Sequence, residues 1–169
     1  MDSAASNIVI IAGVSSSGKS TIGQALAARI DARFLDADDF HPAANITKMA
    51  AGVPLNDDDR WPWLDRLNAE LREAAARGES VVLACSALKA SYRERLGAGL
   101  EGLRLVMLNG SKDLLAARAA ARTHLYMPPS LLDSQLHTLE PLVPGSGWVV
   151  DVTQPPAVIV EDLARRLGR

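Results

Sequence analysis

The chain of 169 residues lacks most features of a secreted or membrane protein. It has a single cysteine, Cys85, so an internal disulfide is impossible and a structural zinc site is not expected. Its longest hydrophobic run, residues 8–14, is far shorter than the roughly 20 residues that cross a bilayer. The first seven residues also lack the positive start of a secretory signal. These absences predict a cytoplasmic protein without a membrane span.

An excess of one charge is also absent, because 18 Lys and Arg nearly balance 20 Asp and Glu, for a formal net charge of -2. No global positive field would attract nucleic acid or an anionic membrane, so neither is an expected partner. Any anionic ligand would have to be held by local groups. With 48% hydrophobic and 22% charged residues the composition is that of an ordinary globular protein, and the length predicts one domain over residues 1–169.

Apolar segments alternate with helical patterns along the chain. Residues 8–12 (IVIIA) are continuous and β-branched and are followed by Gly13, which is typical of a strand buried on both faces of a parallel sheet. This alternation of strand and helix predicts an α/β fold. The other predicted strands are residues 33–35, 81–84, 103–108 and 148–152, and the predicted helices are residues 19–30, 61–77, 88–96, 112–122 and 156–167.

Two polar segments, residues 36–60 and 123–147, fit neither pattern. Long polar segments inside a compact domain are usually functional, and the second has the character of a mobile lid. In the first segment, three consecutive acids from Asp57 to Asp59 precede a helix that is expected to begin at Trp61. Acids in this place could simply complement the helix dipole, so we interpret them as structural.

Residues 13–20 (GVSSSGKS) match the phosphate-binding pattern G-x-x-x-x-G-K-[ST], between a predicted strand and a predicted helix. Glycine at both ends permits a loop that curls around phosphate, with backbone N–H groups facing inward at the head of a helix. Lys19 would reach the β- and γ-phosphates, and the Ser20 hydroxyl would complete the coordination of Mg²⁺. No guanine-reading Asn-Lys-x-Asp segment is present, which favours ATP. The residues assigned to the nucleotide are Gly13, Val14, Ser15, Ser16, Ser17, Gly18, Lys19, Ser20 and Thr21.

Two carboxylates follow the second predicted strand, at the edge where an open parallel sheet forms its ligand crevice. Along an extended chain alternate residues share a face, so Asp36 and Asp38 would face the crevice while Asp39 turns away. One carboxylate could orient an acceptor hydroxyl and take its proton, while the other helps to hold the metal. The alternative is a solvated acidic loop.

Several cations occupy places near the same crevice. The Arg60 guanidinium could bind a substrate carboxylate with two parallel hydrogen bonds. Lys89 and Arg93 lie one turn apart on the helix that follows the third strand, so they should also face the crevice. Arg118 and Arg122 lie four residues apart near the end of a helix, where they could bridge ATP phosphates or only satisfy terminal carbonyls.

Six motifs that together span nearly the whole chain add a resemblance to a known family. They are the phosphate-binding loop, Leu35-Asp36-Ala37-Asp38 with His41-Pro42, Asn45-Ile46-x-Lys48-Met49, Pro54-Leu55-Asn56-Asp57-Asp58-Asp59-Arg60-x-Pro62-Trp63-Leu64, Cys85-Ser86-Ala87-Leu88-Lys89-x-x-Tyr92-Arg93, and Ser134-Gln135-x-x-Thr138-Leu139-Glu140. In these motifs the chain resembles the bacterial gluconokinases, which are relatives of shikimate kinase and the nucleoside monophosphate kinases.

The resemblance implies a three-layer P-loop kinase fold, with a five-stranded parallel sheet, helices on both faces and a small mobile lid over about residues 123–147. It implies transfer of the γ-phosphoryl group of ATP, with Mg²⁺, to the 6-hydroxyl of D-gluconate, often by a homodimer. By position, the implied residues are Lys19, Asp36, Asp38 and Arg122 in catalysis, Arg118 at the nucleotide, Ser20 and Asp36 at the metal, and Asp38, His41, Arg60, Lys89 and Arg93 at the substrate.

The chain departs from the family pattern at two places. Ser16 stands where the family often has glycine, and residues 122–126 (RTHLY) replace the usual Arg-x-Gly-His-Phe of the lid. Two other functions also stay open. One is a P-loop kinase for a different small anionic acceptor, such as shikimate, another sugar acid or a nucleoside monophosphate, and the other is an ATP-binding regulatory module that transfers no phosphate.

Overall fold

Five short parallel strands form the centre of the molecule, in the order β2-β3-β1-β4-β5. The computed structural model describes residues 6–121 and 129–169. The all-parallel sheet and its α/β architecture confirm the predicted fold class. The strands are β1 (Ile8–Ala12), β2 (Arg33–Asp36), β3 (Val81–Ala84), β4 (Arg104–Asn109) and β5 (Trp148–Asp151).

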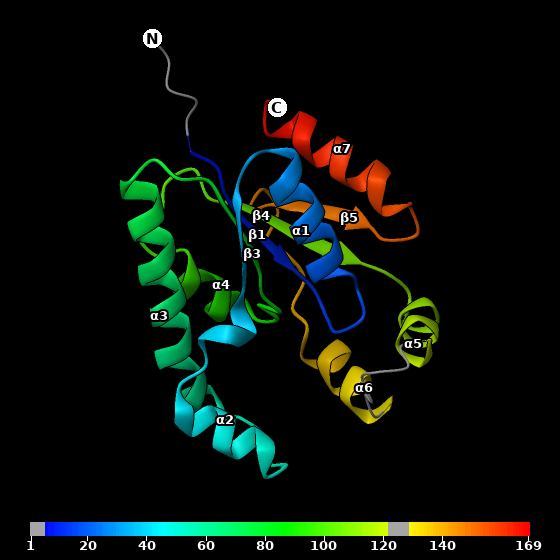
Figure 1. Ribbon diagram of the computed structural model, residues 1–169. Coiled ribbons are helices and arrows are strands. Elements are labelled where there is room, and N and C mark those ends of the chain that lie inside the picture. Colours follow the sequence, from blue (N-terminus) through cyan, green and yellow to red (C-terminus); the bar gives the residue numbers. More distant parts are fainter. Residues whose placement is uncertain (1–5, 122–128) are drawn as a thin grey trace.

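Helices follow the strands and are longer than them (Figure 1). They are α1 (Lys19–Arg29), α2 (Ala43–Ala50), α3 (Asp57–Ala76), α4 (Ala90–Leu96), α5 (Lys112–Ala120), α6 (Pro129–Thr138) and α7 (Pro156–Arg166), with a 3₁₀ turn, η1 (Ala37–Phe40), after β2. The predicted helices 19–30, 112–122 and 156–167 are confirmed to within two residues at each end.

The sheet is covered on both faces, which explains the continuous apolar character of its central strand. Ile8, Ile10 and Ala12 of β1 pack into the core formed with α3 and α4, whereas Val9 and Ile11 pack into the core formed with α1 and α7. Figure 1 shows α3 and α4 on one side of the sheet and α1 and α7 on the other. Because successive strand residues point to opposite faces, both sets must be apolar.

The helix α3 begins four residues earlier than predicted. Asn56 is its N-cap, and its side chain accepts a hydrogen bond from the Asp59 N–H while Asp59 accepts one from the Asn56 N–H. This reciprocal capping box turns the acidic run into the first turn of the helix, so the structural interpretation of the three acids is confirmed. At the other end Gly78 adopts a φ of 72° just after the C-cap, as an αL residue that ends a helix.

The two segments predicted as polar loops each contain a helix. Residues 43–50 form α2, entered through Pro42, whose φ of -59° already suits a helix start. Residues 129–138 form α6, inside the segment predicted as a lid. Both helices are short, with 8 and 10 residues, so each offers too few turns for the sequence pattern to reveal it.

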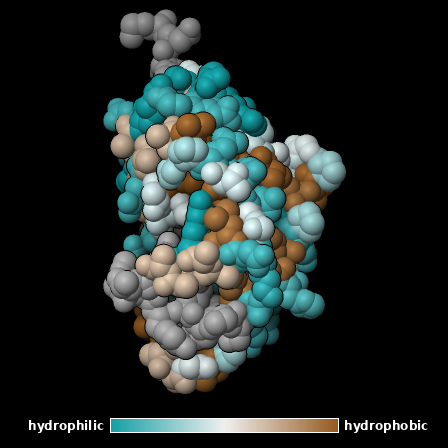
Figure 2. Space-filling model, turned by 90° about the vertical axis from the view of Figure 1, so that its right-hand side faces the viewer, coloured by the Kyte–Doolittle hydropathy of each residue, from teal (hydrophilic) through white to brown (hydrophobic). Residues whose placement is uncertain are grey.

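The helices α2, α5 and α6 gather at the end of the sheet where the strands terminate, with α2 and α6 projecting furthest (Figure 1). Seen from the side of α5, α6 and β5, the surface mixes polar and apolar residues around a central hollow (Figure 2). None of the helices in the described ranges is long and apolar enough to cross a membrane.

Candidate active site

The loop between β1 and α1 has the geometry of a phosphate cradle. Gly13 and Gly18 have φ values of 149° and 96°, which side chains rarely adopt. A Cβ on Gly13 would lie 2.8 Å from Ser17 Oγ and 3.2 Å from the Leu108 carbonyl oxygen, so only glycine fits. The Gly13 N–H donates to the Ser86 carbonyl at 3.3 Å, and Lys19 Nζ donates to the Val14 carbonyl at 3.1 Å. The loop is therefore preformed and anchored to the neighbouring strand.

Ser16 carries two signs of a ligand site. Its φ of 69° is left-handed, which explains physically why glycine suits this position of the loop. Its side chain is 5% exposed, and in the described part of the chain its Oγ is the only fully buried side-chain oxygen or nitrogen atom without a hydrogen-bond partner. A buried hydroxyl without a protein partner is suited to hydrogen-bond a phosphate oxygen.

A cavity of about 270 Å³ opens beside this loop. Its walls come from the loop, from the last turn of α5, from Gln154 between β5 and α7, and from Pro156 at the start of α7. Arg118 also lines it and donates from Nη2 to the Val152 carbonyl at 2.6 Å. Arg118 thus lines the same cavity as Ser16 and Thr21, while its guanidinium satisfies a backbone carbonyl just after β5. Its contact with a nucleotide stays a prediction.

Asp36, the last residue of β2, and Asp38, in the turn that follows, lie together, but not by the alternation that the sequence suggested. The chain turns into η1, and Asp36 caps this turn by accepting a hydrogen bond from the Asp38 N–H at 3.0 Å. Part of Asp38 is exposed to solvent. Partial burial and, next, the Asp36 carboxylate raise the pKa of Asp38, while His41 and Lys19 oppose the rise. Asp38 therefore shares an electrostatic environment with the lysine of the phosphate loop.

His41 is held in a fixed orientation next to these carboxylates. Its ring stacks on Trp63 with 4.3 Å between centroids and 12° between planes, and Nδ1 lies 3.1 Å from Asn45 Nδ2. Burial lowers the pKa of His41, Asp38 opposes this and Arg60 reinforces it. Burial therefore favours the neutral form of the imidazole.

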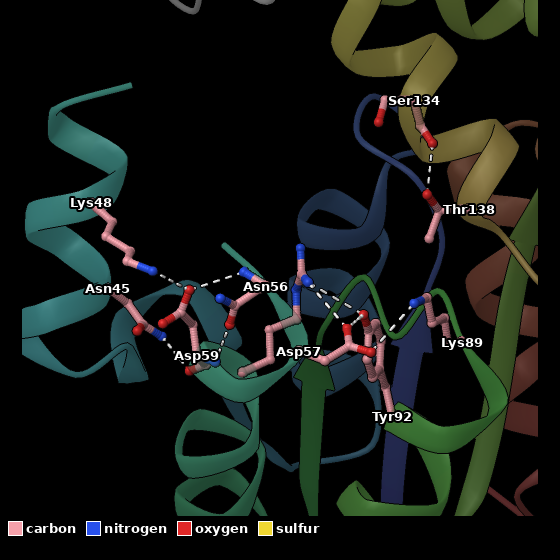
Figure 3. A network of polar contacts seen from close by, with 10 residues as sticks. Asn45, Lys48, Asn56, Asp57, Asp59, Lys89, Tyr92, Ser134 and Thr138 are labelled. Carbon is pink, nitrogen blue, oxygen red and sulfur yellow. Dashed lines mark hydrogen bonds and ion pairs between the residues drawn. The ribbon is translucent and has the colours of Figure 1, made fainter. Parts of the chain in front are cut away.

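Four polar side chains from α3 and α4 form a second cluster at the same end of the sheet (Figure 3). Asp57 accepts a short hydrogen bond from the Tyr92 hydroxyl and lies 3.4 Å from Arg60 Nη1 and 3.5 Å from Lys89 Nζ. The Tyr92 hydrogen bond, and then Lys89 and Arg60, lower the pKa of Asp57. Two cations thus face one carboxylate, which leaves a local positive charge for an anionic ligand.

Arg93 does not lie in the crevice, although the sequence placed it there as a substrate contact. Its side chain is 8% exposed, and its guanidinium donates to the backbone carbonyls of Ala87, Leu88, Glu140 and Pro141. Arg93 does lie on the predicted helix, but residues 140–141 cover its side chain, so the guanidinium points toward backbone carbonyls and not toward a ligand. We therefore interpret Arg93 as a scaffold residue that ties α4 to the chain after α6.

Asp57, interpreted from the sequence as structural, also takes part in the second cluster. Three other residues of the site have no role predicted from the sequence. Asn45 and Tyr92 belong to motifs quoted above, as does Gln135 of α6, whose Oε1 accepts a hydrogen bond from the Ser15 N–H. Nothing in their type or spacing revealed these contacts, because each partner lies on another element. Arg122 and His124 lie outside the described residues.

Comparison with known proteins connects this geometry to a family. The profile of a family described as an AAA domain matches residues 8–142. A probable gluconokinase from Xenopus tropicalis is 40% identical over 178 residues, which cover 96% of this chain and 94% of the relative.

Solved structures agree with this relationship. A gluconokinase from Sinorhizobium meliloti 1021 is 46% identical with a TM-score of 0.82, over 96% of this chain and 92% of that one. A sugar kinase from Janibacter sp. HTCC2649 is 41% identical with a TM-score of 0.87, over 95% and 93% of the two chains. At 18% identity and a TM-score of 0.70, a shikimate kinase from Bacteroides thetaiotaomicron, covering 96% of this chain and 99% of that one, shares the fold alone.

Proposed function

The chain belongs to the gluconokinase family of P-loop kinases, and we propose that its residues transfer the γ-phosphoryl group of ATP to the 6-hydroxyl of D-gluconate. The assignment of catalytic roles rests on the electrostatic interaction between Lys19 and Asp38. Lys19 belongs to the phosphate loop, and Asp38 lies where the sugar acid would bind. A phosphoryl donor and an acceptor hydroxyl held by these two groups would meet between them.

On the nucleotide side, the loop N–H groups and Lys19 would hold the phosphates, and the Ser16 hydroxyl would gain the partner that it lacks. The cavity beside Arg118 would take the remainder of the nucleotide. The left-handed φ values of the loop are already present, so little reorganisation is needed when phosphate binds.

On the acceptor side, Asp38 would accept the proton of the attacking hydroxyl. The oxygen of that hydroxyl forms a bond to the γ-phosphorus, the bond between this phosphorus and the β,γ-bridging oxygen breaks, and ADP leaves with the electron pair. A pKa raised above the ordinary aspartate value makes the Asp38 carboxylate a better base. Arg60 and Lys89 would bind the carboxylate of the sugar acid.

Mg²⁺ suits the residues at the start of α1 and the end of β2. Ser20 is exposed there, and Asp36 uses one carboxylate oxygen for its cap and keeps the other. Mg²⁺ in kinase sites is commonly held by one or two protein oxygens together with substrate phosphates and water, and Ser20 and Asp36 could supply these protein oxygens. When bound, Mg²⁺ would neutralise charge on the transferred phosphate.

The lid role of residues 123–147, the homodimer and the cytoplasmic location stay predictions of the sequence. The lid prediction concerns α6 and its neighbours. Light scattering after size exclusion measures the oligomeric state directly, and fractionation of the native host tests the cytoplasmic location.

The proposed reaction is tested by steady-state ADP production with Mg·ATP and a panel of D-gluconate, other aldonates, shikimate and nucleoside monophosphates. Product identity by mass and NMR would show phosphate on the 6-hydroxyl of gluconate. Turnover of another acid in preference to gluconate would move the acceptor and keep the phosphate site. ATP binding without turnover of any acceptor would favour the regulatory alternative.

A further inference from the structure

Asn45 makes two contacts whose chemistry fixes which way its amide faces. One amide atom lies 3.0 Å from the Asp59 backbone carbonyl oxygen, which can only accept a hydrogen bond, so that atom is the donor Nδ2. Figure 3 shows this contact between α2 and the first turn of α3. The same Nδ2 lies 3.1 Å from His41 Nδ1. Asn45 itself is 3% exposed, so water does not compete with either contact.

The orientation of Asn45 determines where the proton of His41 lies. An amide NH₂ group has two donors and no acceptor, so with one hydrogen on the Asp59 carbonyl the other points to Nδ1. Nδ1 must then accept, which leaves the single proton of the neutral ring on Nε2. Stacking on Trp63 holds the plane of the ring, and Trp63 is itself fixed by a 2.7 Å bond from its Nε1 to the Ala37 carbonyl of η1.

The opposite ring nitrogen remains available. No hydrogen bond among the described residues uses His41 Nε2, and the only fully buried polar side-chain atom without a partner in those ranges is Ser16 Oγ. Within this part of the chain Nε2 is therefore accessible to a ligand. The ring is also near enough to Asp38 for the two groups to interact electrostatically.

We propose that Asn45 is a positioning residue that keeps His41 in its Nε2–H tautomer, so that the imidazole presents a hydrogen-bond donor to the sugar-acid acceptor in the cleft. The identity of that acceptor rests on the proposed function. Asp38 and His41 then have different roles toward the sugar acid. Asp38 takes the proton of the attacking hydroxyl, and His41 donates a hydrogen bond to an oxygen of the sugar acid. In the opposite tautomer His41 Nε2 would be an acceptor like the Asp38 carboxylate, so a substrate oxygen that carries no hydrogen would find no donor in either group.

The tautomer is measured by NMR on protein labelled with ¹⁵N-histidine, without any ligand, at about pH 8, where a histidine of ordinary or lowered pKa is neutral. The His41→Gln variant identifies the His41 signals among those of the three histidines. We expect Nδ1 to resonate as an unprotonated nitrogen and Nε2 as a protonated one. A protonated Nδ1 in the wild-type protein overturns the proposal.

Two variants test the cause. In Asn45→Asp a carboxylate can only accept, so the proton should move to Nδ1 and the ¹⁵N pattern should invert, with kcat/KM for gluconate falling about tenfold. If that variant does not fold, Asn45→Ala removes the donor and should give a mixture of both tautomers. Persistence of the pure Nε2–H pattern in either variant would show that Asn45 does not control the ring.

A matched control separates tautomer control from simple anchoring of α2. Lys48 also ties α2 to α3, through a 2.7 Å ion pair with Asp59, but does not touch the ring. Lys48→Met should keep the Nε2–H pattern, and its loss in this variant would contradict a specific role of Asn45. Because the spectra need no substrate, failure to phosphorylate gluconate would overturn the proposed function and leave the tautomer assignment intact.

Discussion

The Gln135 side chain accepts a hydrogen bond from the backbone N–H of Ser15, with 2.6 Å between Oε1 and the amide nitrogen. This contact joins α6 to the phosphate-binding loop across 120 positions of sequence. Around it, Val14, Leu88 and Leu132 belong to one small apolar cluster, so the loop, the segment before α4 and α6 pack as one unit. The position of α6 and the geometry of the loop are therefore coupled.

Gln135→Leu should weaken ATP binding about 3–10-fold, because the free energy of one hydrogen bond, about 0.5–1.5 kcal/mol, no longer holds the loop. Isothermal titration with ATP measures this effect. Asp133→Asn is the matched control, since it breaks only the exposed ion pair to Lys112 between α6 and α5. Equal ATP affinity in wild-type and Gln135→Leu protein would show that the contact is dispensable.

Asp38→Asn should lower kcat by about 10²–10⁴-fold and leave the Kd for ATP nearly unchanged, because the amide cannot take the proton of the acceptor hydroxyl. Single-turnover kinetics with direct ATP titration separates the two quantities. Asp39→Asn serves as the control, as it changes an exposed acid on the same turn. Retention of wild-type kcat by Asp38→Asn would remove this residue from the chemistry.

Ser16→Gly should raise the Tm of the protein without ATP by about 2–4 °C, which corresponds to about 1 kcal/mol for a chain of this size. It relieves a left-handed φ of 69° and removes a buried hydroxyl without a partner, partly offset by the greater freedom of glycine in the unfolded chain. Ser16→Ala keeps the strained φ, so its Tm should rise less. The reverse order in differential scanning calorimetry would contradict this account of the loop.

Arg93→Met should reduce the free energy of unfolding by about 2–4 kcal/mol, since four backbone carbonyls lose a donor in a buried place. Lys89→Met, one turn away, should instead raise the KM for gluconate with little change in the urea midpoint. Urea unfolding and steady-state kinetics on both variants distinguish a scaffold arginine from a substrate cation. A stable Arg93→Met protein with a raised KM would restore the sequence-based assignment.

Tyr92→Phe should destabilise the protein by about 1 kcal/mol near neutral pH, because Asp57 loses its principal hydrogen bond. The folded-state pKa of Asp57 lies below its ordinary value of 3.8, so this contribution is complete above that value and disappears as the pH falls through the folded pKa. Urea unfolding of both proteins from pH 7 to pH 3 should therefore give curves that converge in acid. A constant difference at every pH would assign the effect to packing.

The sequence alone was sufficient to predict structure wherever the interactions that determine it are between neighbours along the chain. A strand buried on both faces is continuously apolar, which marked residues 8–12, and the phosphate loop is specified by glycines, a lysine and a serine at fixed spacing, which marked residues 13–20. The capping of α3 by Asn56 and Asp59 is equally local, although its acidic run concealed where the helix begins. In these places neighbours along the chain are also neighbours in space.

Only the tertiary structure decided which polar groups meet. The strand order β2-β3-β1-β4-β5 brings Asp38 to Lys19, Tyr92 to Asp57 and Gln135 to Ser15, and it buries Arg93 beneath the segment after α6. Residue type fixes what hydrogen bonds a side chain can make, but in these three pairs the partner lies on another element, up to 120 positions away. The direction of Arg93 also depends on the Glu140 carbonyl, and the proton of His41 on the Asp59 carbonyl that orients Asn45, so both are properties of the fold.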